Sequence, residues 1–256
     1  LFGNLDEAFI KLNGKDISYN NLLDINSAIH LISEFEEPTF AILKHNNACG
    51  IASRKNLIDS WENAIKSDPI SAFGGVLICN RTIDSETAKE INKIFFEVLI
   101  APNFGDDALN ILTEKKNRII LKQKKFKFDS IEHRSVLGCI LSQEKDTKID
   151  TIEIENVVTI KKPSENEISD LIFASKVCKN SKSNAIVLVK NKSLISSGVG
   201  QTSRVDALNH AVEKAKFFKN DISGGVMASD AFFPFPDCVE IAKKAGVTSV
   251  IQPGGS

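Results

Sequence analysis

Lys44 and His45 follow directly on residues 40–43 (FAIL), a short apolar stretch typical of a buried strand. Active sites of α/β proteins lie at the carboxyl ends of strands, so polar residues at this place are candidates for catalysis. A histidine can take a proton from a weakly nucleophilic amine, and a lysine ammonium can stabilise negative charge on a carbonyl oxygen. The pair therefore indicates acyl transfer. The alternative, which an isolated pair would favour, is a solvated lysine beside a capping histidine.

Neighbours within a strand point to opposite faces, so Lys44 and His45 share a pocket only where the pleat breaks. The next residues, 46–50 (NNACG), allow such a break. The other histidines are interpreted as structural, since they fall in predicted helices or in a linker; they are His30, His133 and His210.

Three further segments carry polar or aromatic groups at predicted strand ends. Residues 229–237 (SDAFFPFPD) fit neither a strand nor a helix well and predict either a wall for a flat aromatic ligand or a core plug. Asp237 could instead cap the following helix. Residues 198–204 (GVGQTSR) open a helix behind glycines, an arrangement that suits phosphate, and residues 182–184 (KSN) precede a strand.

Apolar periodicity predicts alternating helices and strands, which is typical of sheets covered by helices. A capping-box pattern at residues 164–167 (SENE) opens a further helix. The other helices are predicted at 20–35, 57–66, 85–96, 105–117, 204–217 and 238–245. The strands are predicted at 40–43, 71–78 (a turn leading into a strand), 98–100, 185–189, 224–228 and 248–251.

The order of features in residues 41–77 recurs in residues 185–227, each time ending in Gly-Gly before a strand. We interpret this as a duplication of two similar α/β units. The predicted boundaries are 1–130, with a helical segment, and 131–256, truncated at its carboxyl end. Between them, the lysine-rich residues 115–127 predict a solvated connecting segment rather than an anion-binding patch.

The composition is that of an ordinary soluble globular protein, with 42% hydrophobic residues and 32 basic against 33 acidic side chains in 256 residues. Nucleic acid is therefore not an expected partner, and no apolar run is long enough for a membrane span. Five dispersed cysteines favour reduced thiols, and we expect a cytoplasmic location. Because the chain starts at Leu1, we expect a piece of a longer protein.

Six motifs together resemble the AICAR (aminoimidazole carboxamide ribonucleotide) formyltransferase part of the bifunctional purine-biosynthesis enzyme family, over nearly the whole chain. They are residues 44–50 (KHNNACG), 68–75 (DPISAFGG), 182–185 (KSNA), 200–206 (GQTSRVD), 229–235 (SDAFFPF) and 252–256 (QPGGS).

The resemblance implies two cytidine-deaminase-like three-layer α/β units and an intertwined homodimer with active sites at the interface. It implies formyl transfer from 10-formyltetrahydrofolate, the cosubstrate, to the 5-amine of AICAR, giving FAICAR in late purine (IMP) biosynthesis. No catalytic metal is implied, although a structural potassium ion is compatible with the family. His45 would be the general base and Lys44 the group that stabilises the transition state. Positions that match ribonucleotide contacts are Gly74, Glu97, Asn184, Arg204 and Phe232; those near the folate are Val205, Asp237 and Ser256.

Some departures from the family pattern stand out. Ala48 replaces a usual proline, and Cys139 stands where a glycine is common. The Arg-Tyr segment before Leu1, the arginine-bearing segment after Ser256 and the IMP cyclohydrolase domain are expected to be missing. An alternative function is therefore a ligand-binding or dimerisation fragment without turnover. A zinc hydrolase on the same fold is the other alternative, but the H-x-E and P-C-x-x-C motifs are lacking.

Overall fold

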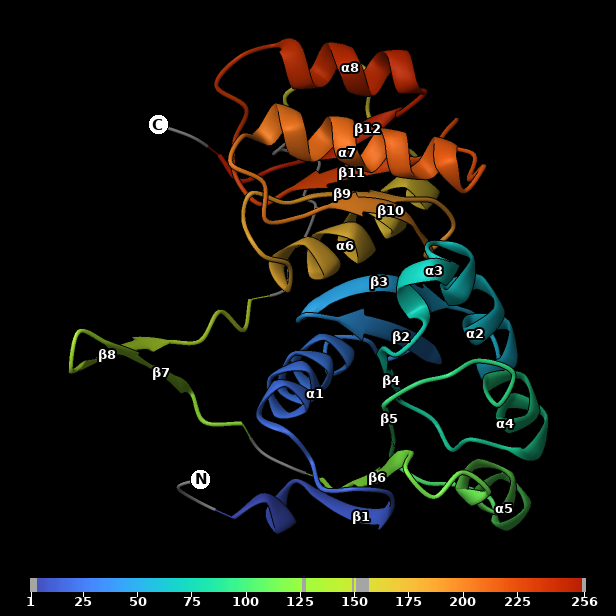
Figure 1. Cartoon of the computed structure of the whole chain (residues 1–256). Helices are drawn as coiled ribbons and strands as arrows, with labels where there is room; N and C mark the ends of the chain where they lie inside the picture. Colours follow the sequence, from blue (N-terminus) through green and yellow to red (C-terminus); the bar gives the residue numbers. More distant parts are fainter. Residues whose placement is uncertain (1–3, 126–127, 149, 151–156, 255–256) are drawn as a thin grey trace.

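The computed structural model of the chain describes residues 4–125, 128–148, 150 and 157–254. Within them, helices cover two mixed β-sheets that lie one above the other, and a separate two-stranded hairpin projects to the side (Figure 1). The predicted α/β class is confirmed.

The first sheet has six strands among the described residues, and three neighbouring ones run parallel. Their spatial order is β1-β6-β5-β4-β2-β3. The parallel strands are β4, β5 and β6, while β2 runs antiparallel to both β3 and β4. The bounds are β1 (Phe9–Asn13), β2 (Thr39–Lys44), β3 (Asn47–Ser53), β4 (Val76–Cys79), β5 (Val98–Ala101) and β6 (Ile119–Gln123).

The second sheet has four strands among the described residues, in the order β10-β9-β11-β12. Only the β11–β12 pair is parallel. The strands are β9 (Ile186–Val189), β10 (Leu194–Gly198), β11 (Val226–Ser229) and β12 (Ser249–Ile251). The helices of this half are α6 (Glu165–Lys179), α7 (Arg204–Phe217) and α8 (Asp237–Ala245).

Alternation along β2 separates the two faces of the first sheet. Ala41 and Leu43 join the core beneath the helix at residues 19–32, whereas Phe40 and Ile42 join the core beneath the four other helices of this half. The helices of this half are α1 (Tyr19–Ile32), α2 (Leu57–Lys66), α3 (Pro69–Ala72), α4 (Ser85–Ile91) and α5 (Asp106–Thr113).

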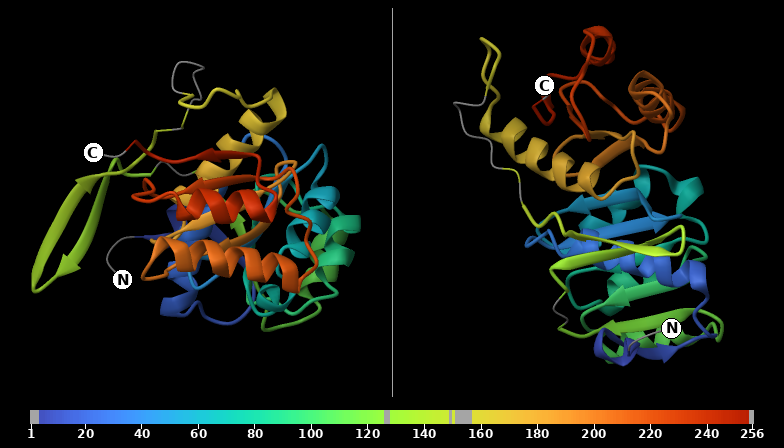
Figure 2. Two further views of the ribbon diagram at one scale, coloured as in Figure 1. Left: turned by 90° about the horizontal axis from the view of Figure 1, so that it is seen from above. Right: turned by 90° about the vertical axis from the view of Figure 1, so that its left-hand side faces the viewer.

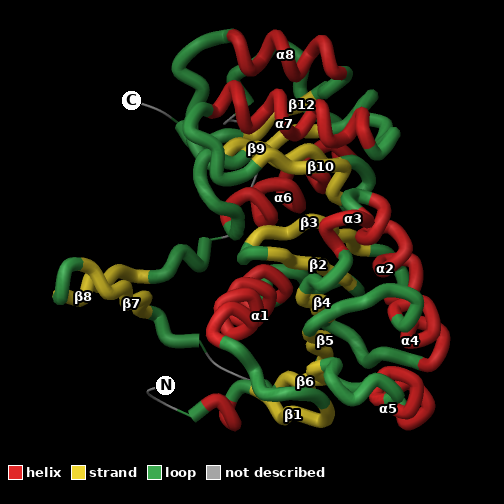
Figure 3. Tube along the Cα trace, viewed as in Figure 1, coloured by secondary structure: helices red, strands yellow, loops and turns green. Residues whose placement is uncertain are grey.

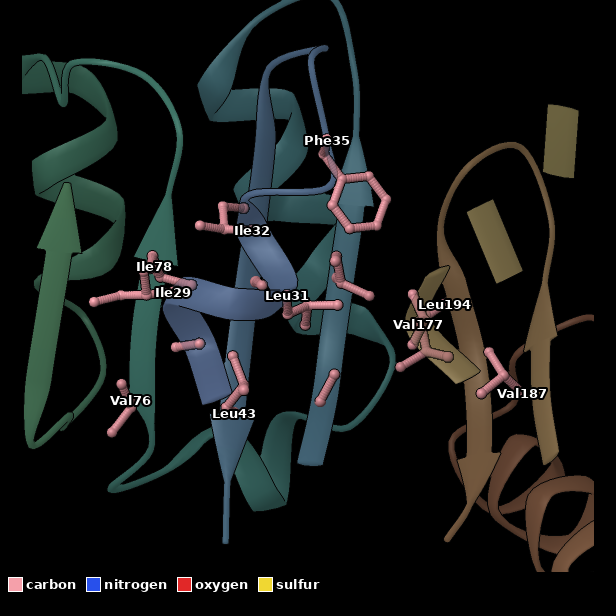
Figure 4. Close-up of a cluster of buried hydrophobic side chains, with 14 of the residues drawn as sticks. Ile29, Leu31, Ile32, Phe35, Leu43, Val76, Ile78, Val177, Val187 and Leu194 are labelled. Carbon is pink, nitrogen blue, oxygen red and sulfur yellow. The ribbon is translucent and has the colours of Figure 1, made fainter. Parts of the chain in front are cut away.

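One apolar core joins the two sheets. Leu31 of α1 and Leu43 of β2 belong to the same cluster as Val177 of α6 and Val187 of β9 (Figure 4). Helix α6 lies between the sheets, and α7 and α8 cover the outer face of the second sheet (Figures 1 and 2). Burial of this shared cluster fixes the two halves against each other.

Local signals predicted two helices to the residue. Helix α2 spans the predicted 57–66, and α7 spans the predicted 204–217. The capping box before α6 is confirmed, because the Ser164 hydroxyl accepts from the Glu167 N–H while the Glu167 carboxylate accepts from the Ser164 N–H.

Three predicted helices end earlier than expected. Those predicted at 85–96 and 105–117 end at Ile91 and Thr113, and the one predicted at 20–35 ends at Ile32. After the helix predicted at 85–96, the buried guanidinium of Arg118 donates a hydrogen bond to the carbonyl oxygen of Ile94 at 3.0 Å. This carbonyl group is therefore satisfied without a further helical turn.

The expectation of a solvated segment at 115–127 is wrong for its middle. Ile119, Ile120 and Leu121 are fully buried in β6, which pairs with both β1 and β5. The flanking lysines concealed a strand whose aliphatic residues are covered on both faces of the sheet. Residues 126–127 lie outside the described part.

The hairpin of β7 (Ile131–Val136) and β8 (Cys139–Glu144) extends away from the body (Figures 2 and 3). It was not predicted, and neither were β1 and β10. We call residues 131–144 the arm. Leu137, Ile140 and Leu141 of the arm are 98%, 70% and 58% exposed.

The division into units 1–130 and 131–256 remains a proposal, in which each unit contains one of the two larger sheets. The units meet where β3 borders β10, since Ala52 bridges Ser193 and the Ser53 N–H donates to the Lys192 carbonyl oxygen at 2.9 Å. Among the described helices, none has the length and apolarity needed to cross a bilayer.

Candidate active site

Lys44 and His45 lie at the tip of the β2–β3 hairpin. His45 and Asn46 form its two-residue turn, with φ of 52° and 68°, and Lys44 pairs with Asn47. Positive φ at both central positions is typical of the turns that match strand twist in two-residue hairpins. The break expected after Lys44 therefore exists, but it is a tight turn, and residues 47–50 form the start of β3 rather than a loop.

The two side chains differ in their surroundings. Lys44 is half-buried, and its Nζ donates to the carbonyl oxygen of Phe73 at 2.8 Å. His45 is exposed at the turn. An ammonium has three donors, and Phe73 occupies one of them.

Gly74 and Glu97 lie at the same edge of the first sheet. Gly74 has φ of 74°, which favours glycine, and its N–H donates to the Phe95 carbonyl oxygen at 2.9 Å. The Glu97 N–H donates to the Gly75 carbonyl oxygen at 3.1 Å, and its carboxylate lies 2.7 Å from Lys15 Nζ. The loops before β4 and β5 thus bring both residues to the end of β2.

This edge corrects one expectation. Functional polar residues were expected at the carboxyl ends of strands, and Lys44 does lie at the carboxyl end of β2. Gly74 and Glu97, however, precede β4 and β5 and lie at their amino ends, because β2 runs antiparallel to β4. Strand direction, which the sequence does not show, decides this.

A second polar cluster surrounds Arg204 at the start of α7. Its Nη2 donates to Asn184 Oδ1 at 2.8 Å and to Asp230 Oδ1 at 3.0 Å, and its Nε donates to Ser229 Oγ at 3.0 Å. The Ser203 hydroxyl caps the helix and so places Arg204 in its first turn. The structure therefore brings Asn184 and Arg204 into direct contact.

Asp230 is the residue that sequence reasoning did not single out. Burial raises the pKa of its carboxyl, but hydrogen bonds from the Ser183 hydroxyl, the Ala185 N–H and Arg204 outweigh burial and hold that pKa below its ordinary range. Its position in the 229–235 motif, directly after β11, was the available signal.

A short chain of hydrogen bonds connects the two clusters. Asn47 Oδ1 accepts from the Lys182 N–H at 2.9 Å, and the Lys182 carbonyl oxygen accepts from the Gly200 N–H at 2.7 Å. The Gln201 carbonyl oxygen then accepts from the Asn184 side-chain amide at 3.0 Å. The hairpin tip of the first sheet and the Arg204 cluster of the second therefore lie at one edge of the molecule.

The aromatic-proline segment, residues 229–237, was predicted to form either a ligand-contacting wall or part of the core, and its rings serve in different ways. Phe233 packs against the core beneath α7 and α8, whereas Phe232 and Phe235 are 40% and 67% exposed. The Phe233 N–H donates to Gln252 Oε1 at 2.7 Å, which ties the segment to the end of β12. Two of the three rings remain available to contact a ligand.

The predicted folate positions are only partly brought together. Val205 is half-buried and packs against the same outer core as Phe233. Asp237 is the first residue of α8, whose N-cap is Pro236. The Asp237 carboxylate accepts from the Cys238 N–H at 2.7 Å, so it supports the first turn without being the cap. Ser256 lies outside the described residues.

A shallow, open pocket of about 580 Å³ lies elsewhere, between α3 and α7. Its lining includes Asp68, His210 and Lys214, and none of the described candidate residues is part of it. Lys214 Nζ lies 2.6 Å from the carboxylate of the buried Asp68, so this ion pair links α7 of the second sheet to the start of α3 of the first. In the part of the chain that the structure describes, no group of three or more His, Cys, Asp or Glu side chains could hold a metal ion.

Comparison with known proteins gives a consistent result. A family model described as AICARFT/IMPCHase bienzyme matches residues 3–214. The bifunctional purine biosynthesis protein PurH of Bacteroides thetaiotaomicron is 62% identical over 255 residues, which are 100% of this chain and 50% of that protein.

Proteins of the same name from Caldicellulosiruptor saccharolyticus and Acetivibrio thermocellus are 50% and 48% identical over 248 and 250 residues. In both cases the match covers 96% of this chain and 48% of the relative. The chain thus spans about half the length of these curated relatives.

Proposed function

The chain belongs to the AICARFT/IMPCHase bienzyme family, and we propose that it transfers the formyl group of 10-formyltetrahydrofolate to the 5-amino group of AICAR. The product is FAICAR, a late intermediate of purine biosynthesis. The observation that carries the proposal is the Asn47–Lys182 hydrogen bond, which holds the Lys44-His45 turn beside the Asn184–Arg204 cluster.

In this mechanism the AICAR amine attacks the formyl carbon and a new C–N bond forms. His45 accepts the amine proton as general base, which typically contributes roughly 10²–10⁴-fold to the rate. The carbonyl oxygen becomes an oxyanion, and Lys44 stabilises it with donors that Phe73 does not occupy. Collapse of the tetrahedral intermediate breaks the bond to N10 of tetrahydrofolate, and N10 takes the proton from the His45 imidazolium as it leaves.

The remaining residues bind the two substrates. Arg204 uses Nε and Nη2 for Ser229, Asn184 and Asp230, so its Nη1 donors are available for an anionic group of the ribonucleotide. We assign the ribonucleotide to Gly74, Glu97, Asn184, Arg204 and Phe232, and the folate to Val205, Asp237 and Ser256.

The active form is proposed to be a homodimer with sites at the interface. The arm supports this proposal, because an isolated two-stranded hairpin is marginally stable in water and its exposed Leu137 and Ile140 need a covering surface. We also propose a cytoplasmic location, no nucleic-acid partner and no catalytic metal. A structural potassium ion remains a proposal that elemental analysis of the purified protein tests.

The test of function is purified protein given AICAR and 10-formyltetrahydrofolate, with tetrahydrofolate release as the readout. His45→Ala and Lys44→Ala should each lower kcat by roughly 10²-fold or more. Unchanged turnover in both variants would remove the mechanism. Calorimetric binding of both ligands without formyl transfer would instead favour a binding or dimerisation module.

A further inference from the structure

Helix α1 contacts the turn that carries His45. The Asn46 N–H donates to Asp24 Oδ1 at 2.5 Å, and Asn46 Oδ1 accepts from the Ser27 hydroxyl at 3.3 Å. Asp24 and Ser27 are three residues apart on α1 and so lie on one face of it. The helix therefore presents a carboxylate and a hydroxyl to the hairpin tip.

The peptide that joins His45 to Asn46 is held on both of its polar atoms. Its N–H donates to Asp24, as above, and its carbonyl oxygen accepts from Asn47 Nδ2 at 2.9 Å. A peptide unit is planar, so fixing both groups fixes the rotations on either side of it. One of these rotations is ψ of His45, which sets the orientation of the 45–46 peptide relative to the His45 side chain.

Such support is needed because the turn is intrinsically unfavourable. His45 and Asn46 both have left-handed φ values, which non-glycine residues adopt only where the surroundings hold them. Asp24 is half-buried, so water competes less for its carboxylate than at an open surface.

We infer that Asp24 is a positioning residue for His45: its carboxylate fixes the 45–46 peptide and thereby the direction in which the imidazole leaves the hairpin. The inference rests on the proposed role of His45 as general base. Asp24 acts through the backbone and does not itself exchange a proton with the substrate.

The first test compares two variants of the 256-residue chain. Asp24→Asn keeps an oxygen that can accept from Asn46, whereas Asp24→Ala keeps none. We expect Asp24→Ala to lower kcat by roughly tenfold or more, because small misplacements of a reacting group have large effects. The KM for AICAR should change by less than about twofold, and Asp24→Asn should stay within about threefold of the parent kcat.

A second measurement separates positioning from a general structural effect. In a His45→Ala background, Asp24→Ala should cause no further loss of residual turnover, since the group that it positions is already gone. An equal loss of activity in both backgrounds would overturn the inference.

A third readout does not depend on turnover. The Asn46 amide should exchange slowly with solvent in the parent and in Asp24→Asn, and faster in Asp24→Ala. Slow exchange in Asp24→Ala would contradict the inference. If Asp24→Ala does not fold, Ser27→Ala, which removes only the hydroxyl contact to Asn46, is the milder variant. If the parent chain shows this exchange pattern but transfers no formyl group, the proposed function fails while the support of the turn stands.

Asp84→Ala is the matched control. Asp84 Oδ1 accepts from the Thr87 N–H at 2.8 Å at the start of α4, away from the candidate site. This variant loses the same kind of bond, so it should lower stability while leaving kcat and Asn46 exchange unchanged.

Discussion

Asn47 on the first sheet accepts a hydrogen bond from the backbone N–H of Lys182, 135 residues along the chain, at 2.9 Å. The same side chain donates from Nδ2 to the carbonyl oxygen of its neighbour His45. The Asn47 side-chain amide therefore contacts both the proposed general base, His45, and the loop that leads into the Arg204 cluster. Asn47 thus connects the two halves of the candidate site.

Substitutions at Asn47 should separate these two contacts. Asn47→Asp keeps an acceptor for Lys182 but loses the donor to His45, so kcat should fall several-fold with little change in the KM for AICAR. Asn47→Ala loses both contacts, so kcat should fall and KM should rise. Steady-state kinetics measure both, and equal KM values in the two variants would argue against the coupling.

Arg204 and Asp230 form a partly buried ion pair whose side chains are only 15% and 12% exposed. Arg204→Met leaves the Asp230 carboxylate without its guanidinium and should cost roughly 3 kcal/mol of unfolding free energy. The double variant with Asp230→Asn removes the stranded charge and should recover more than half of that loss. Urea denaturation followed by circular dichroism checks both values, and a double variant no more stable than the single one would contradict this account.

Glu167 makes the stability of the α6 end dependent on pH. Hydrogen bonds from the Thr248 hydroxyl and the Ser164 backbone lower the pKa of this carboxyl from 4.5 to about 2. A group whose pKa is lower in the folded state stabilises the protein above its unfolded pKa and loses that effect as pH falls through the folded value. Relative to Glu167→Gln, the parent should be more stable above pH 4.5, and the difference should fade as pH approaches about 2. Thermal melts across this range measure it; a constant difference would refute it.

The arm provides a reporter of self-association, because Cys139 at the start of β8 is its exposed thiol. The other four cysteines are buried, and burial raises the pKa of Cys49 and of Cys79 to about 12. A thiol reagent at pH 8 should therefore label Cys139 first.

If the arm packs on a second copy, labelling of Cys139 should slow as protein concentration rises. Leu137→Asp should restore fast labelling and reduce the mass measured by light scattering to that of a monomer. Concentration-independent labelling together with a monomeric parent would exclude a dimer held by the arm.

Local chemistry was enough to predict much of the secondary structure. The ends of α2 and α7 and the capping box at Ser164 depend on neighbours within a few residues, so they can be recognised in the sequence alone. Strand β6 was missed because lysines flank it and because its partner β1 is distant in the sequence. Strand β10 was missed because its serines and glycine mask it, although its partner β9 lies just before it in the chain.

The residue types at the candidate site were likewise evident from the sequence. It provided a lysine and a histidine after a buried strand, an arginine opening a helix, and the motifs that place the chain in its family. Asp24 gave no comparable signal, since it matters only through a contact with a segment that is remote along the chain. Asp230 lay within the 229–235 motif, but its pairing with Arg204 became visible only in the structure.

What the sequence determined by itself was the set of elements and the chemical groups at their ends, because propensities, caps and periodicity act over a few residues. Only the tertiary structure decided that β2 runs against β4, that Gly74 and Glu97 meet Lys44 at one edge, and that Lys182 reaches Asn47. Those relations depend on strand pairing and on burial of the core shared by the two sheets, which are settled by the chain as a whole.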